Sequence, residues 1–286
     1  MKPLTTLLCY IVIMGALAAQ KQQDIPNTEV VTSFTKRLPG LLDSLHLADL
    51  SHSTQPLSVR VWNGRHEVFT VSRDSAVSTD YKMYLAKERL HYISYDIPAS
   101  QSRALVDALL SPATRSLSNG NHVGIGGQWM FIEIATPDVY KIVSHWSPGG
   151  SETADRRHIA RLLSLLRDAA DSEARRAELL DGLPAGDYMW GRTSVRIDRF
   201  IQNDVATTEF YKQAEAKIKQ ELGITDATHH FDYPLIMING QPRKIADLNR
   251  YRMTQVAKFK VVGPKDLRGT IWGGSGANGI VMVVTR

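Results

Sequence analysis

The sequence contains a single cysteine among its 286 residues. This residue, Cys9, lies within the first twenty residues, in a segment that we expect to be removed from the mature chain. The mature protein therefore has no thiol, and we expect neither a disulfide bond nor a cysteine nucleophile in it.

Long apolar runs are also scarce. One such run extends from Leu7 to Leu17, after Lys2 and before the small residue Ala18. It is too short to cross about 30 Å of hydrocarbon as a membrane anchor, which is the alternative interpretation. Its layout is typical of a secretory signal peptide with an A-x-A cleavage site. We therefore predict that residues 1–19 form a signal peptide, that the protein is exported, and that its mature chain has no transmembrane segment.

Acidic residues are scarce in the C-terminal part of the chain. Residues 235–286 contain nine Lys and Arg against two Asp, which gives +7, whereas residues 20–234 contain 24 basic and 27 acidic side chains, which gives −3. A basic unit can dock on acidic surfaces or lipid headgroups, although such charges can also simply solvate an exposed face. Because the chain is expected to be exported, we do not expect nucleic acid as a partner.

The first part of the mature chain has the pattern of β-hairpins combined with helices. Residues 56–74 alternate in polarity on both sides of Asn63–Gly64, which predicts a hairpin. Together with the elements named in the next sentence, this hairpin predicts a compact α+β domain over residues 20–185. The other expected elements are one or two short helices within 27–50 with a break at Pro39–Gly40, a strand within 88–98, a helix at 99–110, a hairpin within 127–150 that turns at Thr136–Asp138, and a long helix from Ser151 to about Asp181.

A Gly- and Pro-rich segment, residues 180–188, introduces a second unit that we place at 186–286. We expect a strand within 188–198 and a helix over 207–222 with Gly223 at its C-terminal cap. Three short apolar segments, 234–240, 256–262 and 279–285, are expected to form one small mixed sheet. The fold class predicted for the whole chain is α+β, with the second unit a small α/β domain.

The three apolar segments carry a recognisable order of motifs. An apolar strand runs into Asn239–Gly240, the segment 256–262 follows, and Gly276-Ala-Asn-Gly279 leads into "IVMVVTR". This order over residues 234–286 resembles the plug domain of TonB-dependent receptors. Trp272 stands where that family usually has Tyr, while Asn239 replaces its usual Asp.

The resemblance assigns a glycine turn to this unit. Such a turn allows positive φ angles and a close approach of backbone to backbone that no β-carbon would permit, and Asn278 tolerates the left-handed region. In receptors the plug is followed by a barrel of upwards of ~220 residues. The printed sequence stops at Arg286, so we expect a plug-like module with no barrel after it. The residues of the glycine turn are Trp272, Gly273, Gly274, Gly276, Asn278 and Gly279.

Candidates for catalysis or metal binding are few. Ser275 lies in "GGSGA", which lacks the final glycine and the following helix of a nucleophile elbow. His229, His230 and Asp232 form a polar group, but a closed zinc site needs four ligands and no partner cluster is evident. We therefore predict no catalytic residue, no metal and no cofactor.

Trp129, His145 and Trp146 in the second hairpin are the candidate binding residues of the first unit. Aromatic side chains on a sheet often line a ligand groove. The interpretation that we favour is that they pack in the core beneath the helix that begins near Ser151.

Together these features predict a non-enzymatic, exported envelope protein in the periplasm, peripheral to the outer membrane. The resemblance implies docking of the plug-like unit on an envelope or outer-membrane protein, such as a receptor or a transport system. Two alternatives stay open. One is a periplasmic hydrolase or metal-dependent enzyme that uses His145 or the His229–Asp232 region, which requires these groups to converge in one concave site. The other is a receptor remnant without a barrel.

Overall fold

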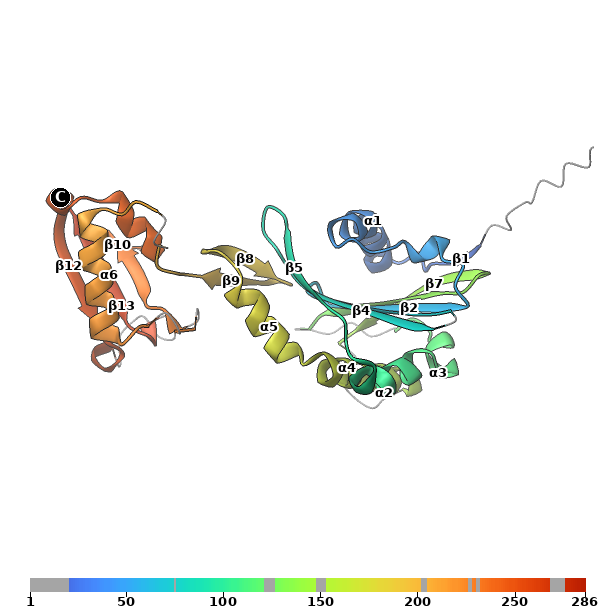
Figure 1. Ribbon diagram of the computed structural model, residues 1–286. Coiled ribbons are helices and arrows are strands. Elements are labelled where there is room, and N and C mark those ends of the chain that lie inside the picture. Colours follow the sequence, from blue (N-terminus) through green and yellow to red (C-terminus); the bar gives the residue numbers. More distant parts are fainter. Residues whose placement is uncertain are drawn as a thin grey trace, which may run out of the picture.

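The computed structural model describes residues 21–74, 76–120, 127–147, 153–201, 205–225, 228–229, 232–267 and 276–286. The expected signal peptide, residues 1–19, lies outside these ranges. Figure 1 shows a large sheet between helices, followed along the chain by a smaller sheet with one helix. The chain belongs to the α+β class, so the fold-class prediction is confirmed.

Nine strands of the described residues form the large sheet, in the order β1-β7-β6-β2-β3-β4-β8-β9, with β5 also paired to β4. All pairs are antiparallel except β1 with β7. Both expected hairpins, β2–β3 and β6–β7, are present. The strands are β1 (Gln22–Asp24), β2 (Leu57–Asn63), β3 (Glu67–Arg73), β4 (Val77–Ala86), β5 (Leu90–Tyr95), β6 (Trp129–Ala135), β7 (Val139–Trp146), β8 (Gly186–Trp190) and β9 (Thr193–Ile197).

Helices cover both faces of this sheet (Figure 1). Helices α2, α4 and α5 pack on one face, and α1 packs on the other. For this reason every residue of β2 from Leu57 to Trp62 is buried, although neighbouring side chains point to opposite faces. The helices of this unit are α1 (Glu29–Ser44), α2 (Ala99–Leu109), α3 (Pro112–Arg115), α4 (Ala154–Ala170) and α5 (Ser172–Asp181).

Helix α1 continues through Pro39, so the expected break at Pro39–Gly40 is wrong. Proline removes one helical hydrogen bond and disfavours a helix interior. Here Leu38 and Leu42 continue the buried stripe that begins with Val31 and Phe34. Packing of this stripe on the sheet offsets the lost hydrogen bond, because tertiary contacts supply most of the stability of a helix in a protein.

The long helix expected from Ser151 to Asp181 is two helices, so that expectation is also wrong. Asp171 separates α4 from α5 with a left-handed conformation, φ 47°. Its side chain accepts a hydrogen bond from the backbone N–H of Ala174 and so caps α5. The apolar pattern runs on through this residue, and the pattern therefore could not reveal the change of direction.

Two further expectations need correction. The strand expected within 188–198 is the hairpin β8–β9, which turns at Gly191 with φ 61°. The longest strand, β4, was not expected at all, because its sequence is polar at Ser78, Thr79 and Asp80 and lacks clean alternation. It is nevertheless central, since Tyr81, Met83 and Leu85 are buried in the core.

The second unit contains a four-stranded sheet in the order β11-β10-β13-β12, within the described residues. Strands β10 and β13 are parallel and the other pairs are antiparallel, so the expected mixed sheet is confirmed. Helix α6 packs on one face, and Gly223 caps it with φ 66° as expected. The elements are α6 (Glu209–Leu222), β10 (Leu235–Ile238), β11 (Gln241–Arg243), β12 (Val256–Val262) and β13 (Ile280–Thr285).

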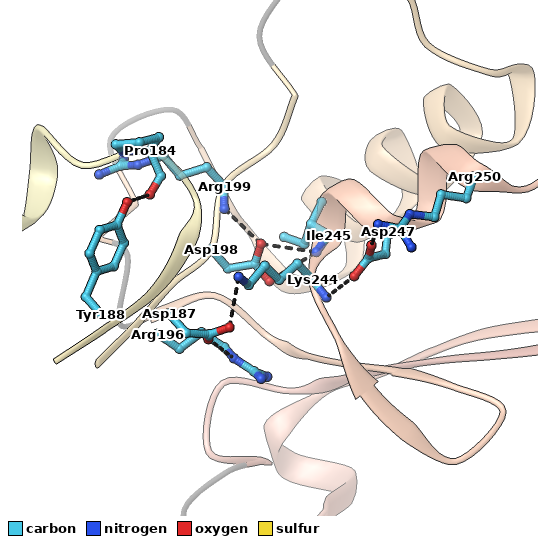
Figure 2. A network of polar contacts seen from close by, with 10 residues as sticks. All are labelled: Pro184, Asp187, Tyr188, Arg196, Asp198, Arg199, Lys244, Ile245, Asp247 and Arg250. Carbon is cyan, nitrogen blue, oxygen red and sulfur yellow. Dashed lines mark hydrogen bonds and ion pairs between the residues drawn. The ribbon is translucent and has the colours of Figure 1, made fainter. Parts of the chain in front are cut away.

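The β8–β9 hairpin connects the two units. It joins the large sheet through the pair Ala86–Met189. At its base, Asp198 accepts hydrogen bonds at 3.1 Å from the backbone N–H of Ile245 in the second unit, and Lys244 Nζ lies 3.0 Å from Asp187 Oδ2 (Figure 2). Ile197 belongs to the hydrophobic core of the first unit and Phe200 to that of the second, so the chain passes from one core to the other between these residues. The boundary that we placed near Gly186 coincides with the first residue of this shared hairpin.

Candidate functional sites

The second unit presents an edge strand beside a helix. Strand β12 is the last strand of its sheet, and on the side away from β13 it pairs with no other described strand. A cavity of about 420 Å³ lies between this strand and α6. An edge strand offers unpaired backbone N–H and C=O groups to another chain.

The lining of this cavity combines apolar and basic side chains. The rings of Phe210 and Phe259 meet edge-on with their centroids 5.6 Å apart. Met253 is 46% exposed at the rim. Lys217 Nζ lies 5.6 Å from the Phe259 ring centroid and 3.6 Å from Glu221, and the exposed Lys258 lines the cavity from β12. The cavity can therefore accept an apolar side chain together with a negative charge.

The glycine turn lies only partly within the described residues. Trp272, Gly273 and Gly274 fall outside them. Gly279 has φ 98°, and a β-carbon there would lie 3.0 Å from the Val262 carbonyl oxygen. This is the close backbone approach that the sequence predicted, and it lies where β13 begins beside the end of β12.

The left-handed asparagine of this unit is Asn239, with φ 50°, rather than Asn278. Its amide forms two hydrogen bonds of 2.9 Å with Thr285, one as donor and one as acceptor. Asn239 therefore joins the β10–β11 turn to the end of β13. This role explains why a side chain with both a donor and an acceptor suits this position.

A second and larger cavity, about 1310 Å³, is a groove between α1 and the large sheet. Trp129 and Trp146 line it, with their ring centroids 5.3 Å apart and their planes at 72°. Both face α1, so the expectation that they pack beneath the helix beginning near Ser151 is wrong. That helix covers the opposite face of the sheet.

His145 does not join these two tryptophans. It neighbours Trp146 on one strand and therefore points to the other face. There its Nε2 lies 2.7 Å from the Ser118 carbonyl oxygen, and burial lowers the pKa of its ring. A β-carbon at Gly120 would lie 2.7 Å from His145 Nδ1, so the ring is tightly enclosed. His145 thus has the surroundings of a packed core histidine.

The groove also contains positive charges that the sequence analysis missed. Arg37 comes from α1, Arg65 from the β2–β3 turn and Arg192 from the β8–β9 turn, while Glu29 is the one acidic residue among the described lining residues. Burial, and then the charge of Arg65, lower the pKa of Arg37. These arginines are 28 to 155 positions apart in the sequence, so only the fold brings them together.

A buried polar network lies beneath α1. Glu133 is fully buried and accepts hydrogen bonds from Trp62 Nε1 at 2.7 Å, Tyr140 Oη at 2.6 Å and Arg60 Nη1 at 3.3 Å. Arg60 also donates to Thr70 Oγ1 and the Ala48 carbonyl. Burial, and then the Glu133 charge, raise the pKa of Tyr140, which stays protonated and can donate. Because every member has partners, this network is structural.

Of the remaining candidates, His229 and Asp232 lie within the described residues. His229 Nε2 lies 3.8 Å from Asp181 Oδ1. The backbone carbonyl of His229 accepts a hydrogen bond from the backbone N–H of Asp232. His230 and Ser275 lie outside the described residues. Within the described ranges, no group of three or more His, Cys, Asp or Glu side chains could hold a metal ion.

No helix of the described residues is both long enough and apolar enough to cross a membrane. No family model matches the chain, and neither a curated protein nor a solved structure matches it.

Proposed function

We propose that the protein is a non-enzymatic, exported protein of the periplasm that docks through its second unit on an envelope protein. The proposed partner is an outer-membrane receptor or transport system, and its docking segment is an extended, acidic stretch of chain. The resemblance of residues 234–286 to a receptor plug domain supports an outer-membrane partner.

The observation that carries this proposal is the position of β12. An extended peptide can add as a further strand to an exposed sheet edge, with backbone hydrogen bonds giving affinity and side-chain pockets giving specificity. The cavity between β12 and α6 supplies such a pocket, lined by Phe210, Phe259 and Met253. Lys217 and Lys258 at the same cavity favour an acidic side chain on the partner.

The enzyme alternative receives less support from the geometry. It requires His145 or the His229–Asp232 region to converge with other titratable groups in a concave site. Neither His145 nor His229 lines either of the two cavities. His145 instead lies in a packed environment against the Ser118 carbonyl.

The proposal is tested by capture from solubilised envelope with the mature chain as bait. We expect one outer-membrane protein to be retained by the wild type and lost with Lys258→Glu and with Met253→Glu, which place an acidic group at the cavity. Overlapping synthetic peptides of the captured protein should then identify one extended acidic segment that binds the purified chain.

Lys212→Glu is the matched control. Lys212 is exposed on α6, and the helical rotation of 100° per residue places it on the side opposite Phe210, Ala214 and Lys217. This variant carries the same charge change and should keep the partner. Equal loss with Lys212→Glu and Lys258→Glu would show a non-specific charge effect, and retention by Lys258→Glu and Met253→Glu would exclude β12 as the docking edge.

A further inference from the structure

We propose that the groove between α1 and the large sheet is a binding site for an organic anion with a planar ring system. This site lies in the first unit and is separate from the docking edge at β12. The proposal rests on three features of the groove: its charge, its aromatic lining and its polar groups that have no partner among the described residues.

The first feature is an excess of positive charge. Arg37, Arg65 and Arg192 approach the groove from three separate elements, against the single acidic residue Glu29 in the described lining. None of the three arginines forms an ion pair within the described part of the chain. Arg37 and Arg65 are close enough for the charge of one to lower the pKa of the other. Like charges held together are stabilised by an anion between them, and guanidinium groups bind carboxylate, sulfonate and phosphate oxygens through paired hydrogen bonds.

The second feature is the aromatic lining. Trp129, Trp146 and Trp190 all border the groove, and the Trp190 ring stacks on His66 with a centroid distance of 4.7 Å. Trp129 and Trp190 are only partly buried, so part of each side chain is accessible to a ligand. Planar rings pack on such faces in offset or edge-on arrangements. An aliphatic ligand would gain less from this lining than a ring system.

The third feature is a set of unused hydrogen-bonding groups. Trp62 donates its indole N–H to Glu133, whereas the indoles of Trp129, Trp146 and Trp190 donate to no group in the described residues. His66 Nδ1 is buried and has no partner there either. Of these groups, the indole N–H groups of the groove wall are the ones offered to an oxygen acceptor of a ligand or to water, because His66 Nδ1 is enclosed by its neighbours.

The size of the groove limits the ligand further. Its volume of about 1310 Å³ exceeds the range of roughly 300–1,000 Å³ that is usual for small-molecule sites. A single ring would leave most of it empty. The geometry therefore favours two or more rings with an anionic substituent directed at Arg37 and Arg65.

The test uses two fluorescent probes that share a ring system and differ in charge. 8-Anilinonaphthalene-1-sulfonate is anionic, and N-phenyl-1-naphthylamine is its neutral counterpart. We expect the wild-type chain to bind the anionic probe at least about tenfold more tightly than the neutral one, because charge-assisted hydrogen bonds are strong. The double variant Arg37→Gln/Arg65→Gln should lose this difference while binding the neutral probe as before.

Arg103→Gln is the control variant, since Arg103 is exposed on α2, which packs on the opposite face of the sheet. It should bind both probes as the wild type does. Trp129→Leu should weaken both probes, which locates them in the groove. Equal affinity of the wild type for the two probes, or unchanged binding of the anionic probe by Arg37→Gln/Arg65→Gln, would overturn the proposal. A urea unfolding curve for each variant confirms that the fold is intact.

Discussion

At the scale of single residues, the strongest constraint is the buried ion pair between Arg60 and Glu133. Both side chains are at most 1% exposed, and the pair is surrounded by Trp62, Tyr140 and Thr70 as further partners. Burying two charges costs more free energy than their attraction returns unless the remaining hydrogen bonds are satisfied. These three side chains, together with the Ala48 carbonyl, satisfy them here, so loss of one member leaves the others unpaired.

We therefore predict that Glu133→Ala lowers the free energy of unfolding by about 3–5 kcal/mol, because it leaves the Arg60 charge buried without a counterion. Urea denaturation followed by circular dichroism measures the change. The double variant Arg60→Met/Glu133→Leu removes both charges and should cost less than Glu133→Ala alone. A double variant that is less stable than the single one would contradict this explanation.

At the scale of elements, sequence pattern and backbone conformation disagree at two places. Helix α1 passes through Pro39 because its buried stripe continues on the far side. Helices α4 and α5 separate at Asp171 although helical spacing continues across it. At Pro39 the packing of the flanking turns outweighs the local preference against a helix, whereas at Asp171 a local left-handed residue ends α4 and caps α5.

The α4–α5 junction gives a prediction at this scale. Asp171→Ala removes a helix cap and places a β-carbon without a polar group in the left-handed region, and should lower the free energy of unfolding by about 1–2 kcal/mol. Asp171→Asn retains the cap and tolerates the conformation, so it should stay within about 0.5 kcal/mol of the wild type. Thermal or urea unfolding of the three proteins checks this, and equal loss with both variants would argue against the capping role.

At the scale of the whole molecule, the β8–β9 hairpin is the segment that contacts both units. Trp190 at the end of β8 and Arg192 in the turn line the groove. At the base of the hairpin, Asp198 and Asp187 contact Ile245 and Lys244 of the second unit. Figure 2 shows these contacts gathered at one place. The Lys244–Asp187 pair is partly exposed, so the buried Asp198 is the more sensitive of the two links.

Asp198 should make stability depend on pH. Burial, opposed by the hydrogen bonds from Ile245 and Arg199, raises the pKa of Asp198 to about 6 from its ordinary value of 3.8. Because the folded-state pKa is the higher one, the favourable contribution of the protonated carboxyl is fully present below pH 3.8 and is lost as the pH rises through 6. The side chain of Asn does not titrate.

The free energy of unfolding of the wild type should thus fall relative to that of Asp198→Asn by about 2 kcal/mol between pH 4.5 and pH 7. Urea denaturation of both proteins at the two pH values measures this difference, and comparison with the variant cancels the titration of all other groups. A difference that does not change with pH would show that the buried carboxyl is not the group responsible.

The sequence by itself determined the elements whose signals are local. Asn63–Gly64 and Thr136–Asp138 placed two hairpins, and Gly223 ended α6, because turn and cap conformations depend on the residues that occupy them. The order of apolar segments in the second unit predicted a small mixed sheet, and Gly279 predicted a close backbone approach. The period of two along a strand also places neighbouring residues such as His145 and Trp146 on opposite faces of the sheet.

Only the tertiary structure decided which face of the large sheet each helix covers, and therefore that Trp129 and Trp146 face a groove. Alternation shows that two side chains share a face, but it does not reveal what lies opposite that face. The gathering of Arg37, Arg65 and Arg192 depends on β8–β9 joining the sheet beside β4, a long-range pairing with no local signature. Long-range pairings depend on the packing of the whole chain, and this is why the elements of this protein were predictable while its groove was not.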